Sequence, residues 1–97
     1  MESKFIKFLK TIGINQDDYE TIVGICPGLE CVEDSELCKN ISLVMEYGYP
    51  KEDLDSLILI NPGFLMWDNI ELENRLIEIV KTYIDLEIAL KNDPYLI

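Results

Sequence analysis

The stretch that decides the fold covers residues 48–65 and reads GYPKEDLDSLILINPGFL. Its apolar residues Leu54, Leu57 and Ile58 recur at intervals of three and four, which predicts one buried face of an α-helix. A proline then ends the helix, because the residue before a proline is pushed out of α geometry. The stretch therefore predicts a short helix over 50–60 between a glycine turn and a proline turn.

The same pattern occurs earlier in the chain, over residues 13–29, as GINQDDYETIVGICPGL. Sliding it by 35 residues aligns it with 48–64 and leaves five identical positions, occupied by glycine, aspartate, isoleucine, proline and glycine. A third, partial copy with an offset of 32 places Asp93–Ile97 on Asn61–Leu65. Repeats of this length are typical of helical solenoids, in which neighbouring units bury each other's apolar faces.

We therefore predict an all-α fold, built as a short right-handed, solenoid-like stack of about two and a half helix-turn-helix units. The chain forms one domain over 1–97, with units near 1–33, 34–67 and 68–97. The helices are expected over residues 2–12, 16–25, 34–47, 50–60 and 69–91. The last helix is predicted to be continuous because its apolar stripe persists from 72 to 90, although the repeat alignment favours a break near Tyr83 and Ile84.

Turns and helix ends follow from residue type. Asn15, Asp34 and Asp68 are expected to cap the helices that follow them, since short polar side chains accept hydrogen bonds from the first free N–H groups. Glycine and proline mark the structural turns, because glycine adopts left-handed backbone conformations and proline stops or starts helices. The predicted turn residues are Gly13, Pro27, Gly28, Gly48, Pro50, Pro62 and Gly63.

The charge balance restricts the class of partner. The chain has 8 basic and 19 acidic residues, for a net charge of −11. Residues 1–10 carry three lysines and one glutamate, or +2, which leaves −13 for residues 11–97. Such a surface repels phosphate backbones and anionic membranes, so direct nucleic-acid binding is expected to be weak or absent. A basic protein is the expected partner; the alternative is that the acidity only maintains solubility.

The first ten residues lack a signal-peptide core, and no apolar run is long enough to cross a membrane. A cytoplasmic protein is therefore expected. The odd cysteine count, from Cys26, Cys31 and Cys38, favours free thiols. Histidine is absent, which removes the commonest general base and metal ligand, so no cofactor, metal or catalytic residue is predicted.

A candidate partner-binding site lies around the second unit. Tyr49 and Trp67 are residue types that dominate binding hot spots, and Glu52, Asp53 and Asp55 form an acidic cluster beside them. The alternatives are structural: aromatic residues are more often part of the core, and acidic residues at a helix start complement its dipole.

The segment 48–65 resembles the repeat of mitochondrial transcription termination factors, the mTERF-type proteins. The resemblance implies stacked helix pairs that bind nucleic acid along a basic concave face. This chain departs from that pattern, because it has only five basic residues after position 10. Two hypotheses result: a non-enzymatic module whose acidic surface binds a protein or peptide, and a nucleic-acid-related protein that either binds nucleic acid directly or mimics its charge in a basic protein groove.

Overall fold

The computed structural model describes residues 3–97, in which every regular element is an α-helix or a 3-10 helix and no strand occurs. The all-α prediction is therefore confirmed. Residues 1–2, where the helix expected over 2–12 would begin, lie outside the described residues. The elements are α1 (Lys4–Thr11), α2 (Gln16–Ile25), η1 (Pro27–Cys31), α3 (Asp34–Glu46), η2 (Lys51–Asp53), α4 (Leu54–Ile60), η3 (Pro62–Met66), α5 (Asn69–Tyr83), α6 (Leu86–Asn92) and η4 (Pro94–Leu96).

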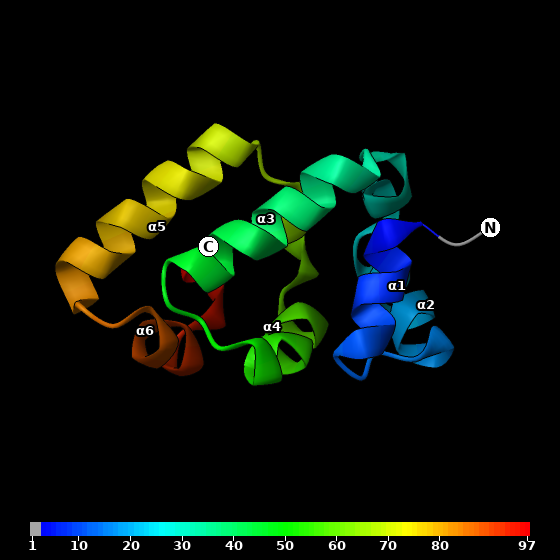
Figure 1. Cartoon of the computed structure of the whole chain (residues 1–97), viewed down its shortest axis with the longest axis horizontal. Coiled ribbons are helices and arrows are strands. Elements are labelled where there is room, and N and C mark those ends of the chain that lie inside the picture. Colours follow the sequence, from blue (N-terminus) through cyan, green and yellow to red (C-terminus); the bar gives the residue numbers. More distant parts are fainter. Residues whose placement is uncertain (1–2) are drawn as a thin grey trace.

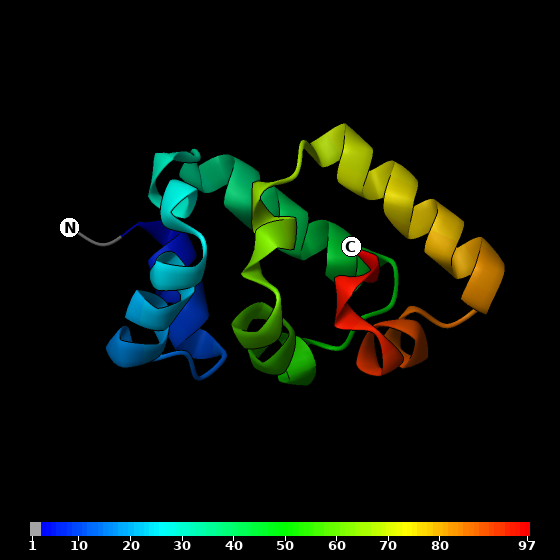
Figure 2. The same ribbon diagram turned by 180° about the vertical axis from the view of Figure 1, so that it is seen from behind.

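The helices form two rows along the 40 Å long axis of the molecule. Helices α1, α3 and α5 make one row, in which α3 contacts both of the others. Helices α2, α4 and α6 make the second row, which we call the short-helix row; in Figure 1, α4 and α6 lie below α3 and α5, whereas α2 lies beside α1. Figure 2 shows the molecule from behind. The 3-10 helix η1 leads from α2 to α3, η3 leads from α4 to α5, and η4 follows α6. The two rows and these connections enclose one continuous core.

A short α-helix followed by a 3-10 helix that begins with proline occurs three times. The pairs are α2 with η1, α4 with η3, and α6 with η4. In the central pair Leu54, Leu57 and Ile58 are all buried, as their spacing predicts. Phe64 of η3 is also fully buried.

The glycine turns divide into two kinds. Gly13 and Gly48 have φ values of 92° and 118°, so both adopt the left-handed conformation predicted for them. Gly28 and Gly63 lie inside 3-10 helices without positive φ, which corrects the prediction that they make sharp turns. Gly28 lies against the end of the Met66 side chain, since a Cβ atom there would be 2.8 Å from Cε of Met66.

The prolines lie where helices stop or start. Pro27 and Pro62 each follow a helix end after one intervening residue, as predicted. Pro50 precedes the 3-10 helix η2 rather than opening an α-helix, so the helix expected over 50–60 begins as a 3-10 turn.

The prediction of a continuous helix over 69–91 is wrong. Helix α5 ends at Tyr83, Ile84 takes φ 69° and ψ −45°, and α6 begins at Leu86. Asp85 caps the new helix by accepting a hydrogen bond from the N–H of Ile88. The break allows α6 to fold back beside α4, where Leu86 and its apolar neighbours are buried. This long-range packing outweighs the local helical periodicity.

Ile84 therefore shares a positive φ with Gly13 and Gly48, and the N–H of Asp85 donates to the carbonyl oxygen of Tyr83 across it, as in a γ-turn. A sparsely populated backbone conformation with positive φ costs a non-glycine residue roughly 1–3 kcal/mol, and the Ile84 side chain recovers little of it because it is 85% exposed. We expect Ile84→Gly to raise the free energy of unfolding by about 0.5–1 kcal/mol, after the greater freedom of glycine in the unfolded chain is subtracted. Gly48→Ala is the matched control and should lower it by about 1–2 kcal/mol. Urea unfolding measures both, and destabilisation by Ile84→Gly would contradict the strain at this position.

The helix caps agree with the sequence at two of three positions. Asn15 and Asp68 accept hydrogen bonds from the first turns of α2 and α5, as predicted. Asp34 does not cap the helix that follows it, because Glu33 is the N-cap of α3. The Asp34 carboxylate accepts instead from the backbone N–H of Phe5, at 2.9 Å, and so ties α3 to the first turn of α1. Only the tertiary structure brings these two residues together.

Candidate partner-binding surface

The structure separates the five residues of the predicted binding site. Tyr49 is only 5% exposed and packs in the core, so its side chain supplies no open contact surface. Trp67 follows η3 and remains 36% exposed. Glu52 is exposed, whereas Asp53 and Asp55 are half-buried. Of the predicted residues, Trp67 and Glu52 are thus the most accessible to a partner.

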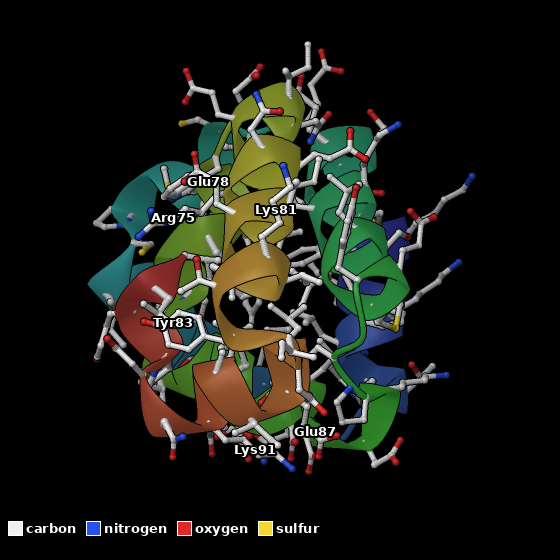
Figure 3. All side chains as sticks on the ribbon, turned by 90° about the vertical axis from the view of Figure 1, so that its left-hand side faces the viewer. Arg75, Glu78, Lys81, Tyr83, Glu87 and Lys91 are labelled. Carbon is white, nitrogen blue, oxygen red and sulfur yellow. The ribbon has the colours of Figure 1, made fainter. Side chains whose placement is uncertain are left out.

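Asp53 is committed to an internal ion pair. Its carboxylate lies 2.9 Å from Nζ of Lys91, which also lies 2.6 Å from the carboxylate of Glu87. Hydrogen bonds to these two carboxylates raise the pKa of Lys91, so the ammonium form is favoured. Figure 3 shows Glu87 and Lys91 together at the C-terminal end of the molecule. This ion pair joins the N-cap residue of α4 to α6, and it offsets the negative charge of Asp53 locally.

A cleft of about 240 Å³ lies between α4 and α6 beside this ion pair. Burial, followed by the nearby charge of Asp53, raises the pKa of Tyr49 at the cleft wall, so its phenol is favoured in the neutral form. The residues lining the cleft are Tyr49, Asp53, Ser56, Leu57, Ile60, Leu90, Lys91 and Pro94. The cleft therefore marks the junction of two short helices, with apolar walls and a charge pair at its rim.

Basic residues are unevenly placed on the described surface. The segments 16–31 and 54–66, which contain α2 with η1 and α4 with η3, have no lysine or arginine. Arg75 and Lys81 lie on α5 at the C-terminal end (Figure 3). The Arg75 side chain is engaged there, because Nε donates to the carbonyl oxygen of Leu96 at 2.7 Å and Nη1 lies 3.7 Å from Glu78. The short-helix row of the first two pairs consequently presents acidic and neutral side chains.

The same row exposes large apolar side chains. Ile25 and Ile60 are the last residues of α2 and α4, occupy equivalent positions 35 residues apart, and are both more than half exposed. Met66 packs over Gly28 of the first pair, and the Tyr95 hydroxyl donates to the carbonyl oxygen of Ile60 at 3.3 Å. These contacts connect all three pairs. We define the apolar strip as Ile25, Ile60, Met66 and Tyr95, whose exposed fractions range from 40% to 67%.

Sequence reasoning did not single out this strip. It identified the match between Ile25 and Ile60 in the repeat alignment, but isoleucines in a short apolar helix are ordinarily core residues. The strip could have been found from the directions in which neighbouring isoleucines point on the helix. Ile60 lies two residues after Ile58, which is fully buried, and positions two apart on a helix point in different directions.

The three cysteines have different surroundings. Cys26, Cys31 and Cys38 are all free thiols; Cys31 is exposed, whereas Cys26 and Cys38 are half-buried. Burial, and then the charge of Asp34, raises the pKa of the Cys38 thiol, which disfavours the nucleophilic thiolate. In the part of the chain that the structure describes, no group of three or more acidic or cysteine side chains is placed to hold a metal ion.

No helix within residues 3–97 combines the length and apolar character needed to cross a membrane. The chain matches no family model, no curated protein and no solved structure.

Proposed function

We propose that this protein is a non-enzymatic interaction module whose acidic surface binds a basic protein or peptide. The observation that carries the proposal is the absence of lysine and arginine from 16–31 and 54–66, the segments that make most of the short-helix row. Opposite charges on two proteins steer their encounter and exclude wrong partners. A basic partner is therefore the class that this surface favours.

The architecture supports the same proposal. The three pairs of a short helix with a 3-10 helix would form a solenoid-like stack, in which α1, α3 or α5 precedes each pair. Stacks of this kind present extended surfaces that bind proteins or nucleic acids. The resemblance to mTERF-type repeats belongs to this proposal, because it concerns how the units stack.

Charge decides between the two classes of partner. A nucleic-acid binder gains affinity by neutralising phosphates with several lysines or arginines. Residues 11–97 offer 5 basic against 18 acidic side chains, and Lys91 is already paired with two carboxylates. The remaining basic cluster is at the N-terminal end, with Lys4, Lys7 and Lys10. Protein binding is accordingly the first function proposed, and occupation of a basic protein groove in place of nucleic acid is a special case of it.

The test combines capture and direct binding. The immobilised protein should capture from host lysate a protein with a positive net charge, and the purified pair should associate more slowly as salt rises from about 50 to about 300 mM. Fluorescence anisotropy with labelled duplex and single-stranded DNA at about 50–100 mM salt should show no sub-micromolar binding. Sub-micromolar DNA binding that is lost when Lys4 and Lys7 are neutralised would instead establish the nucleic-acid function.

A further inference from the structure

We propose that the apolar strip of Ile25, Ile60, Met66 and Tyr95 is the docking site of a basic amphipathic α-helix. The inference rests on the proposed function and deepens it, because it names both the surface and the form of the partner. Such a helix would lay its apolar stripe on the strip and extend its lysines and arginines toward the flanking carboxylates.

The strip has the continuity that a helix requires. Met66 of the second pair covers Gly28 of the first pair, and Tyr95 of the third pair is hydrogen bonded to the backbone of Ile60. The strip thus draws its residues from all three pairs, whose ribbons Figure 2 shows from behind. A helix of about 18 residues is about 27 Å long, at 1.5 Å per residue, and is shorter than the 40 Å long axis of the protein.

Charges at the border of the strip specify a basic occupant. Glu30, Asp68 and Asp93 are exposed and lie two positions along the chain from Gly28, Met66 and Tyr95, and the carboxylates of Asp68 and Asp93 also accept backbone hydrogen bonds at the starts of α5 and η4. The basic residue nearest to Ile60 in the α4–α6 cleft is Lys91, whose ammonium is held between Asp53 and Glu87. A ligand with lysines beside an apolar stripe therefore meets carboxylates, whereas an acidic helix meets repulsion.

A second copy of this chain fits the strip less well. Each copy carries a net charge of −11, and the strip's own border is acidic, so face-to-face pairing would bring like charges together. Apolar contact together with flanking charge complementarity requires a partner of opposite sign. The helix-in-groove mode supplies both through residues spaced at i, i+3, i+4 and i+7.

The probe is an 18-residue peptide of leucine and lysine with helical periodicity, labelled with fluorescein. Its binding to the full chain is followed by anisotropy at about 150 mM salt, where weak surface attraction is largely screened. The variant Ile25→Ser with Ile60→Ser should weaken binding at least tenfold. The matched control is Ile84→Ser with Ile88→Ser, which removes two isoleucines that are more exposed than Ile25 and Ile60 and lie outside the strip, and it should leave binding unchanged. Circular dichroism verifies that both variants fold.

The outcomes separate the docking proposal from the proposed function. Equal binding by wild type and the strip variant would overturn the docking site while leaving a basic partner possible. Failure of the peptide to bind, together with no basic protein captured from lysate, would overturn both. A wild-type dimer in analytical ultracentrifugation that becomes monomeric in the strip variant would show that a second copy covers the strip. The same peptide with glutamate in place of lysine should not bind.

Discussion

Asn40→Asp should lower the free energy of unfolding by about 3–5 kcal/mol, the range expected when a buried charge is left uncompensated. Asn40 is the one fully buried polar side chain of residues 3–97. Its Nδ2 group donates to the carbonyl oxygens of Phe64, Leu65 and Trp67, at 3.3, 3.0 and 2.8 Å. The aspartate carboxylate has the same shape but no hydrogen to donate. Its negative charge would therefore lie against three carbonyl oxygens.

The hydrogen bonds of Asn40 fix the path of η3. This segment turns the chain from α4 to α5, and its backbone carbonyls find a donor on α3 through Asn40. Asn69 at the start of α5 donates to Oδ1 of Asn40 at 2.6 Å, so the Asn40 side chain joins α3, η3 and α5. Arg75, 35 residues later, similarly donates to the carbonyl oxygen of Leu96 in η4. The loss of Asn40 should therefore loosen both η3 and the start of α5.

Urea unfolding followed by circular dichroism measures the effect, and pH provides an internal check. Burial raises the pKa of the introduced carboxyl above its unfolded value near 3.9, so the destabilisation should shrink as pH falls and the carboxyl gains a proton. Asn74→Asp is the matched control, since Asn74 is exposed on α5, and should change stability by less than about 0.5 kcal/mol. A similar small effect from Asn40→Asp would contradict the hydrogen-bond network.

Leu57→Ala should lower the free energy of unfolding by about 2–5 kcal/mol, the range found when a buried leucine leaves a cavity. Leu57 is 2% exposed and lies in α4 between the two rows of helices. Ile60→Ala, three residues later in the same helix, should cost less than about 0.5 kcal/mol because Ile60 is largely exposed.

This pair tests the orientation of α4, on which the apolar strip depends. Thermal and urea unfolding should show a much larger loss of stability for Leu57→Ala than for Ile60→Ala. Both variants should keep a helical circular dichroism spectrum. Comparable losses from Leu57→Ala and Ile60→Ala would mean that Ile60 packs in the core, and the strip would then lose its central residue. A small effect confined to Ile60→Ala leaves that side chain free for a partner.

The residue pattern determined the local elements of this protein. The spacing of Leu54, Leu57 and Ile58 sets the buried face of α4, and Gly13 and Gly48 take the left-handed conformation because only glycine does so without strain. Proline two residues beyond a helix end begins the 3-10 helices η1, η3 and η4. These features depend on sterics and periodicity within a few residues, so they are legible in the sequence.

The candidate site was predicted only in its chemical character. The acidic surface follows from composition alone, whereas the position of each side chain does not. Tyr49 and Asp53 were assigned to an open surface, but Tyr49 is buried and Asp53 is paired with Lys91, which lies 38 residues away in the chain. The exposure of Ile25 and Ile60 likewise depends on which face of each short helix the longer helices cover.

Residue types and their spacing were enough to predict where short helices stop, that the fold is all-α, and that the chain is acidic overall. The break at Ile84, the hydrogen bond of Asp34 to α1 and the burial of Asn40 against η3 depend on how the helices pack. The difference lies in how far apart along the chain the interacting residues are. Backbone preference and apolar spacing act between neighbours, while burial and hydrogen bonds across 25 or 29 residues form only when packing has brought those segments together.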